Sequence, residues 1–214
     1  MSIEIKKLTV GPLLENCYIV FESDNEKNTC FLVDPGAGGQ RIINSLKSLK
    51  LTPQAIFLTH GHFDHIMAVD WVRREYPGVK VYAQKKEAEV INNPENSLLS
   101  NLARDYFIDD VNYLEDGEKI TLADIPCEVI HTPGHTVGSS CLFLTGENII
   151  FSGDTLFYES AGRTDFPTGS TMDLSLSINE VLMKLPEETS VYPGHGESTT
   201  IGHEKKYNFC VYMR

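Results

Sequence analysis

Residues 55–65 read AIFLTHGHFDH, an apolar run that leads straight into a cluster of histidines with one aspartate. The apolar run predicts a short buried strand, and His60, His62, Asp64 and His65 follow at its end. Because residues i and i+2 of an extended segment face the same side, His60 and His62 are expected to point into one pocket. Asp64 and His65 lie where a helix is predicted to begin, so the turn of the chain directs them at a second, adjacent point. Two candidate ligands at each of two points predict a binuclear metal site, since imidazole and carboxylate suit Zn(II), Fe or Mn.

Three further candidate ligands stand in glycine-containing turns after predicted strands. His135 lies in TPGHT (132–136), Asp154 in SGDT (152–155) and His195 in PGHG (193–196). Glycine lets a backbone approach a site closely, and loops at strand ends often carry functional groups. Each alone would be an ordinary loop residue. The first cluster and these turns together contain five of the seven histidines of the chain. An Asp64 that only capped a helix would leave this grouping unexplained.

The composition is that of an ordinary globular protein with an acidic balance. The chain has 214 residues, 41% of them hydrophobic and 22% charged, with a formal net charge of −12. This length suits one domain, and the negative charge argues against nucleic acid and anionic membranes as partners. The five cysteines are odd in number and form no C-x-x-C pair, which predicts reduced thiols in a cytosolic protein. Residues 1–10 do not resemble a signal peptide and no apolar run approaches the ~18 residues of a membrane span, so we expect a soluble, cytoplasmic protein.

Strands and helices are predicted in mixed order along the whole chain. The sequence predicts strands at 3–10, 17–22, 30–33, 55–58, 79–83 and 190–192, several strands between 118 and 151, helices at 40–50, 64–76, 85–92, 173–185 and 198–206, and a helical or loop-like insertion at 97–107. The first three strands are expected to form an antiparallel meander. With no linker or repeat dividing the chain, this order predicts layered sheets with helices outside, in a single domain of residues 1–214.

The ordered motifs H-x-H-x-D-H, T-P-G-H-T, S-G-D-T and P-G-H-G resemble those of the metallo-β-lactamase superfamily, over about residues 10–206. Within it, GDTLF (153–157) and GRTD (162–165) resemble the glyoxalase II, or hydroxyacylglutathione hydrolase, branch. More narrowly, the chain is similar to a short bacterial subgroup without the C-terminal helical extension that binds glutathione. The resemblance implies an α/β (α+β) fold, a four-layer αββα sandwich with the metals at one edge of the two sheets.

The resemblance also assigns the ligands. It implies a first metal on His60, His62 and His135, a second on Asp64, His65 and His195, and Asp154 bridging both. The expected cofactors are two divalent ions, Zn²⁺ in the first place and Fe or Mn as alternatives. A hydroxide between the metals would be the nucleophile, so Asp64 and Asp154 are also expected to be catalytic.

Other residues carry weaker expectations. Asp34, in VDPG, matches a motif common in the superfamily and is expected to steady a ligand histidine, with a simple turn-forming role as the alternative. Arg163 is predicted to meet a substrate carboxylate, or else to pair with Asp165 or face solvent. Tyr158 is a candidate for the substrate pocket. His131 and His203 are not expected to be ligands.

The leading functional prediction is metal-dependent hydrolysis of a small-molecule thioester such as S-lactoylglutathione. One alternative is a persulfide dioxygenase with a single non-haem iron on His60, His135 and Asp154, since related dioxygenases keep the same motif. Another is hydrolysis of a different ester, lactone or phosphoester. A β-lactamase is disfavoured because no export signal is present and Asp154 bridges, and a ribonuclease is disfavoured by the acidic charge. Only 19 residues follow His195, and their ending departs from that of the short subgroup, so the thiol is left open. The protein is expected to be a monomer or a homodimer.

Overall fold

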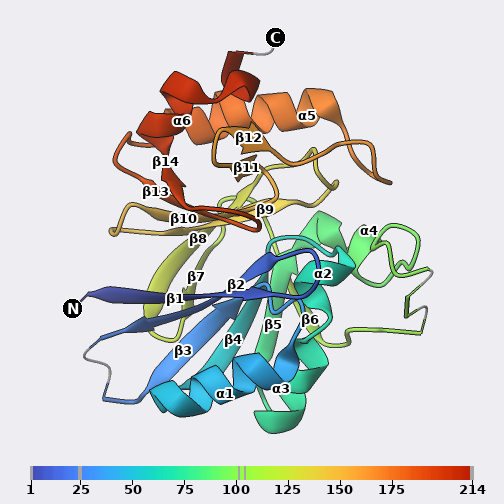
Figure 1. Ribbon diagram of the computed structural model, residues 1–214, viewed down its shortest axis with the longest axis vertical. Helices are drawn as coiled ribbons and strands as arrows, with labels where there is room; N and C mark the ends of the chain where they lie inside the picture. Colours follow the sequence, from blue (N-terminus) through green and yellow to red (C-terminus); the bar gives the residue numbers. More distant parts are fainter. Residues whose placement is uncertain (1, 24–25, 101, 104, 213–214) are drawn as a thin grey trace.

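The computed structural model describes residues 2–23, 26–100, 102–103 and 105–212. Two six-stranded sheets face each other, and helices cover the outer face of each. In Figure 1 the layers follow one another from bottom to top: helices α1 and α3, the first sheet, the second sheet, then helices α5 and α6. This is the predicted α/β fold in four αββα layers, with two mixed sheets flanked by helices.

The first sheet has the strand order β1-β2-β3-β4-β5-β6. Its strands are β1 (Ile3–Val10), β2 (Glu15–Glu22), β3 (Thr29–Val33), β4 (Thr52–Leu58), β5 (Lys80–Gln84) and β6 (Val111–Leu114). The first three strands pair antiparallel, as predicted, and β3 to β6 pair parallel. The carboxyl ends of the parallel strands therefore lie at one edge of the sheet, and the histidine cluster follows β4 at that edge.

The second sheet has the strand order β14-β13-β10-β9-β8-β7. Its strands are β7 (Lys119–Leu122), β8 (Ile125–His131), β9 (Ser140–Leu144), β10 (Ile149–Gly153), β13 (Ser190–Pro193) and β14 (Thr199–Thr200). Strands β10 and β13 are parallel, and the other neighbours in the sheet are antiparallel. A small hairpin of β11 (Leu156–Phe157) and β12 (Ser160–Ala161) follows β10. Strands β8, β10 and β13 all end at the edge that holds the predicted ligands.

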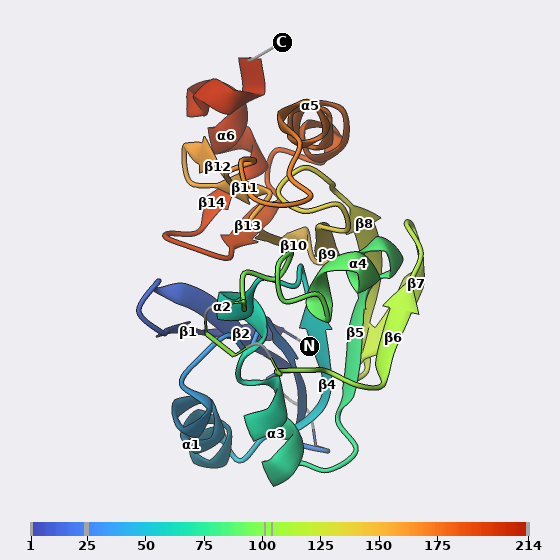
Figure 2. The same cartoon turned by 90° about the vertical axis from the view of Figure 1, so that its right-hand side faces the viewer.

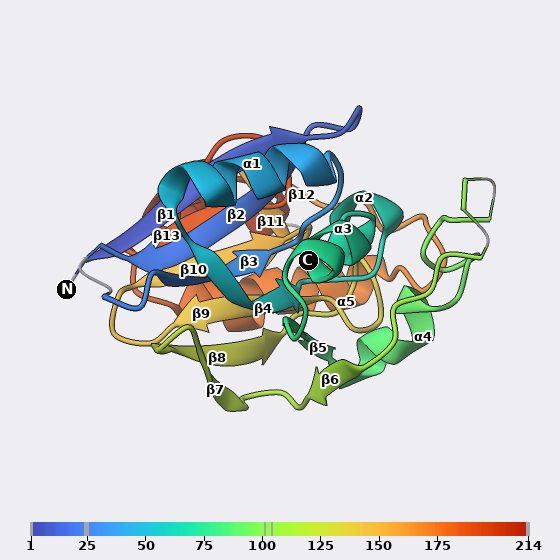
Figure 3. The same ribbon diagram turned by 90° about the horizontal axis from the view of Figure 1, so that it is seen from below.

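The helices are short apart from α1. They are α1 (Gly39–Leu49), α2 (Phe63–Ile66), α3 (Val69–Glu75), α4 (Ala88–Ile91), α5 (Thr171–Leu176) and α6 (Ile201–Tyr207), with single turns η1 (Lys85–Glu87), η2 (Ser177–Val181), η3 (Leu182–Lys184) and η4 (Phe209–Tyr212). In α1 the apolar residues Ile42, Ile43 and Leu46 share one buried face, which is the helical spacing read from the sequence. Figure 3 shows α1 and α3 lying over the outer face of the first sheet.

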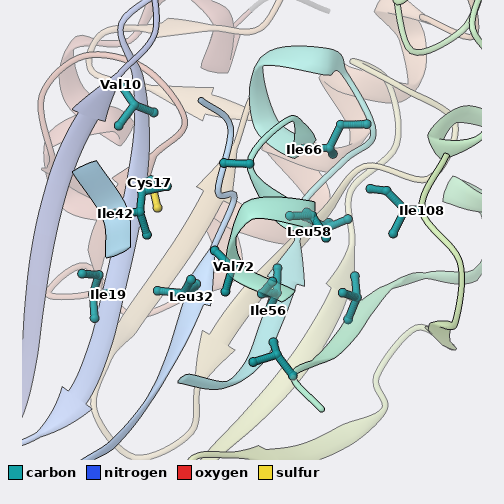
Figure 4. Packing of buried hydrophobic residues seen from close by; sticks show 14 of the residues in the cluster. Val10, Cys17, Ile19, Leu32, Ile42, Ile56, Leu58, Ile66, Val72 and Ile108 are labelled. Atoms are coloured by element: carbon teal, nitrogen blue, oxygen red, sulfur yellow. The ribbon is translucent and has the colours of Figure 1, made fainter. Parts of the chain in front are cut away.

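Three apolar clusters hold the four layers together. One packs α1 and α3 on the first sheet and includes Ile42, Leu32 and Val72 (Figure 4). The second lies between the sheets, where the rings of Tyr18 and Phe151 approach with centroids 5.2 Å apart. The third packs α5 and α6 on the second sheet. Because both faces of each sheet are covered, its central strands are buried on both sides.

Several predicted elements differ in the structure. The helix predicted at 64–76 is divided into α2 and α3, because the N–H of Ala68 donates to the carbonyl of Pro35 at 2.9 Å and leaves the helical pattern. The helix predicted at 198–206 begins only at Ile201, since Thr199–Thr200 pairs with β13 as β14. Strand β6 was not predicted, and the helix predicted at 173–185 runs from α5 into the irregular turns η2 and η3.

Two remaining expectations concern the insertion and the cysteines. The described part of segment 97–107 is a series of turns, and residues 101 and 104 lie outside the described residues. All five cysteines are free thiols, and four of them are buried. Within the described ranges, no helix combines the length and the apolar character needed to cross a membrane.

Candidate metal centre

All seven predicted ligands lie at one edge of the two sheets. His60 and His62 follow β4, and Asp64 and His65 lie in α2 directly after them. His135 follows β8, Asp154 follows β10, and His195 follows β13. Figure 2 shows α2 beside the end of β10, so segments far apart in the sequence come together here. The first sheet supplies four of the candidate ligands and the second sheet supplies three.

The first group consists of His60, His62 and His135, all buried, with potential ligand atoms within 4.8 Å of one another. The Nδ1–H of His135 donates to the carbonyl of Arg163 at 2.7 Å, so its Nε2 carries the free lone pair. That Nε2 lies 2.9 Å from Nδ1 of His62. The hydroxyl of Thr59 lies 3.1 Å from Nδ1 of His60. His60 and His135 are therefore oriented through Nδ1, which leaves Nε2 of each ring for the centre. His62 instead turns its Nδ1 toward Nε2 of His135.

The second group consists of Asp64, His65 and His195. Nε2 of His195 lies 3.3 Å from Oδ2 of Asp64, and Nε2 of His65 lies 3.8 Å from the same oxygen. The Nδ1–H of His195 donates to the carbonyl of Leu13 at 3.1 Å. The Nδ1–H of His65 donates to Oδ2 of Asp34 at 2.9 Å. Both rings thus turn Nε2 toward the carboxylate of Asp64.

Asp154 lies between the two groups. Its Oδ1 is 3.5 Å from Nε2 of His65, and its Oδ2 is 3.5 Å from Nε2 of His135 and 3.7 Å from Nε2 of His195. One carboxylate therefore contacts histidines of both groups. This is the position that a bridging ligand needs.

Four polar atoms of the candidate ligands have no hydrogen-bond partner among the described residues. They are Nε2 of His60, His62 and His65 and Oδ1 of Asp154, and all are buried. Buried polar atoms without partners destabilise a fold, unless a bound ion satisfies them. Imidazole nitrogens and carboxylate oxygens at these separations are donors that divalent transition metals accept. The buried histidine and aspartate groups are consistent with a binuclear metal site.

A third arrangement of potential ligands joins Asp34 to His60 and His65. Both oxygens of Asp34 already accept hydrogen bonds: Oδ1 from the N–H of Thr59 at 2.7 Å, and Oδ2 from the Thr59 hydroxyl at 2.6 Å and from His65. Because these contacts occupy its oxygens, we assign Asp34 to the support of His65 and of the end of β4. Its backbone has a positive φ of 48°.

The electrostatics favour neutral imidazole in the first group. Burial lowers the pKa of His60 and of His62 well below the usual value, and neighbouring histidines lower it further. Burial would also lower the pKa of His65, but the carboxylates of Asp154, Asp64 and Asp34 raise it well above the usual value. Burial would raise the pKa of Asp64, yet His65 and His195 hold it well below the usual range. His60 and His62 are therefore in the neutral form that binds a metal, whereas His65 has to release a proton when an ion binds.

The sequence profile of the metallo-β-lactamase superfamily matches residues 10–195. The chain belongs to the metallo-β-lactamase superfamily. It is 40% identical over 183 residues to a probable metallo-hydrolase of Streptococcus pyogenes, covering 83% of this chain and 78% of that protein. It is 34% identical over 211 residues to the hydroxyacylglutathione hydrolase GloC of Haemophilus influenzae, covering 97% of each. Its family and its buried groups of potential metal ligands identify it as a metallo-hydrolase of this superfamily.

Solved structures agree with this assignment of the fold. The BLEG-1 B3 metallo-β-lactamase superposes with a TM-score of 0.86 and 35% identity, over 98% of this chain and 100% of that one. TTHA1623 in a di-iron-bound form superposes with a TM-score of 0.80 and 33% identity, over 95% of this chain and 98% of that one.

A cavity of about 290 Å³ opens over the metal centre of this metallo-β-lactamase fold. Its apolar lining consists of Leu13, Phe63, Leu98, Phe157 and Phe166. Arg163 also lines it, but its guanidinium donates to both oxygens of Asp165, at 2.8 and 2.6 Å, and lies 4.1 Å over the ring of Phe166. Of the roles foreseen for Arg163, the structure displays the pair with Asp165.

Tyr158 does not line this cavity. Its exposed ring stacks on His203 with centroids 4.9 Å apart and lines a separate pocket with Tyr192. Phe157, the last residue of β11, lines the cavity over the metal centre instead, and Tyr158 lies in the turn that follows. His203 contacts Glu159 at 2.9 Å, and His131 contacts the carbonyl of Val137 at 3.0 Å, so neither belongs to the ligand groups.

The hairpin of β1 and β2 has a role at the site that sequence reasoning missed. The backbone N–H of Asn16 donates to the carbonyl of Gly194 at 2.7 Å, and its side-chain amide donates to Pro193 at 3.1 Å and Gly196 at 3.0 Å. The hydroxyl of Tyr18 donates to Pro193 at 2.6 Å. These donors hold the loop that carries His195. The sequence signal for this role was the polar pair Glu15-Asn16, which stands directly before the apolar run of residues 17–20.

Proposed function

We propose that this chain is a binuclear metal-dependent hydrolase of thioesters, with S-lactoylglutathione as the representative substrate. The observation that carries the proposal is the carboxylate of Asp154, which lies between two three-residue ligand groups beneath an open cavity. The similarity to the hydroxyacylglutathione hydrolase GloC supports the thioester. The GDTLF and GRTD motifs, which first indicated this branch, flank the same cavity through Phe157 and Arg163.

Each group of residues has a separate role in the proposed reaction. His60, His62 and His135 would hold one ion and Asp64, His65 and His195 the other, with Asp154 shared. Bound divalent ions lower the pKa of coordinated water toward ~7 and polarise a carbonyl group, so no serine or cysteine nucleophile is needed. The Nδ1 hydrogen bonds of His135, His65 and His195 hold each ring in one tautomer and orientation. The apolar wall of the cavity excludes water around the scissile bond and strengthens the electrostatic contacts inside.

Metal content and thioester activity test the proposal together. Protein purified without chelators is expected to contain about two metal ions per chain and to hydrolyse S-lactoylglutathione. Asp154→Ala is expected to lose metal and to lower activity by more than about 100-fold. Asp173→Ala removes an exposed carboxylate near the start of α5 and serves as the matched control. Full metal occupancy without activity on any acyl-thiol would contradict the thioester hydrolase.

Two of the similar structures supply alternatives for the same measurement. Because TTHA1623 was solved with two irons, the metal analysis has to distinguish iron from zinc. A single iron per chain, with oxygen consumption on glutathione persulfide, would instead favour a dioxygenase that uses His60, His135 and Asp154. The BLEG-1 protein is named a β-lactamase, so a chromogenic cephalosporin belongs in the substrate panel. Simple esters, lactones and phosphoesters complete that panel.

A further inference from the structure

Glu87 is a fully buried carboxylate that is not among the ligand groups. It ends the η1 turn after β5, and its two oxygens face two different loops of the site. Oε1 accepts the backbone N–H of Gly61 at 2.7 Å, and Oε2 accepts the hydroxyl of Thr136 at 2.8 Å. The N–H of Gly138 also donates to this carboxylate and helps to lower its pKa.

The partners of Glu87 stand directly beside metal ligands. Gly61 separates His60 from His62, and Thr136 follows His135. Gly61 and Thr136 lie outside helices and strands, so neither receives support from regular secondary structure. The Gly61 loop comes from the first sheet, and the Thr136 loop comes from the second. Glu87 therefore joins the two loops that carry the three-histidine group.

Close packing supports the same contact. A Cβ at Gly138 would lie 2.1 Å from the backbone nitrogen of Glu87, and a Cβ at Gly61 would lie 2.9 Å from that of Ile91. Both loops thus press against the turn from η1 into α4, closer than any side chain would allow. A buried carboxylate costs several kcal/mol unless hydrogen bonds compensate it. An apolar residue would fill this space without that cost, but it would leave the N–H of Gly61 unpaired.

We propose that Glu87 is a positioning residue that sets the distance between His135 and the His60–His62 pair, and so the affinity of the three-histidine group for its metal. Asp34, in contrast, contacts both groups: it accepts from His65 directly and reaches His60 through Thr59. The inference rests on the binuclear site of the proposed function and is independent of the substrate. It predicts that a change at Glu87 weakens the metal of the three-histidine group and leaves the second group nearly unchanged.

Zinc titration against a competing chelator tests this in two backgrounds, each with one ligand group left intact. His195→Ala leaves the three-histidine group, and His62→Ala leaves the second group. Burial raises the pKa of Glu87 to about 7, so the titrations are done at pH 8, where the carboxylate is ionised.

Glu87→Gln keeps the shape of the side chain but replaces one acceptor with a donor. In the His195→Ala background it is expected to weaken zinc binding about 10- to 100-fold. In the His62→Ala background the change should stay within about twofold.

The comparison variants make the result specific. Asp34→Asn is expected to weaken zinc binding in both backgrounds, because Asp34 contacts His65 directly and His60 through Thr59. Glu89→Gln removes an exposed carboxylate from the adjoining helix α4 and serves as the control. Thr136→Val removes the donor at the other end of the contact, so it should share the selectivity of Glu87→Gln with a smaller effect. It also provides the test if Glu87→Gln does not fold.

Two outcomes would overturn the inference. One is equal weakening in both backgrounds together with a lower melting temperature of the metal-free protein, which would assign Glu87 to general stability. The other is unchanged zinc affinity in both backgrounds. A wild-type protein that binds two zinc ions but hydrolyses no thioester would contradict the proposed function and leave these zinc titrations valid.

Discussion

Gly194 lies where the loop after β13 passes the metal centre, and only the absence of a side chain keeps that space open. A Cβ at this position would lie 2.2 Å from Oδ1 of Asp154 and 2.7 Å from Cε1 of His65. Gly194→Ala is therefore expected to displace both ligands and to lower zinc affinity by about tenfold or more. Metal analysis after gel filtration measures the loss. Gly146→Ala is the control, because it strains a backbone with a positive φ of 96° but meets no atom within 4 Å. Two retained ions in Gly194→Ala would contradict this geometry.

A second single residue, Glu87, is expected to make the stability of the fold depend on pH. Burial raises its pKa from 4.5 to about 7. Between these values the folded chain keeps a proton that the unfolded chain has lost, so this group's contribution to stability is present at low pH and is lost as the pH rises. For wild-type protein relative to Glu87→Gln, the free energy of unfolding is expected to fall by on the order of 3 kcal/mol from pH 4.5 to 7.5. Urea unfolding of both metal-free proteins across this range measures it. A difference that is flat or rises with pH would contradict the shift.

At the scale of elements, the β1–β2 hairpin holds the loop of His195 through Asn16. Asn16→Ala removes two side-chain hydrogen bonds, while Tyr18 still donates to Pro193 and Lys7 to Gly196, so each lost bond costs about 0.5–1.5 kcal/mol. The loop should then loosen, so zinc binding by the second group should weaken more than binding by the three-histidine group. Titrations in the His62→Ala and His195→Ala backgrounds separate the two effects. Asn44→Ala, on the exposed side of α1, is the control, and equal losses at both groups would argue against a specific role of the hairpin.

For the whole molecule, the metal centre connects the two sheets. His60, His62, Asp64 and His65 follow a strand of the first sheet, and the other ligands follow strands of the second. Two ions, each at 100 times its dissociation constant, would together stabilise the fold by about 5 kcal/mol. Removing them with a chelator is expected to lower the melting temperature by roughly 10–20 °C, and added zinc should restore it. An unchanged melting temperature after verified metal loss would show that the layers do not depend on the ions.

The sequence by itself determined the local features of this protein: the apolar strand before His60, the buried face of α1, the paired histidines at i and i+2, and the glycine turns at His135, Asp154 and His195. These follow from periodicity and turn chemistry, which act over a few residues. With the family resemblance, they also predicted the αββα layers.

Only the tertiary structure decided the contacts between distant segments. It placed Asn16 on the His195 loop, Glu87 between two ligand loops, Arg163 on Asp165, and Tyr158 outside the cavity with Phe157 inside it. It also divided the helix predicted at 64–76 through a hydrogen bond to Pro35. Such contacts depend on how two sheets pack and on which buried polar groups find partners there. Local sequence pattern carries no record of that pairing, because the interacting residues lie up to 180 positions apart in the chain.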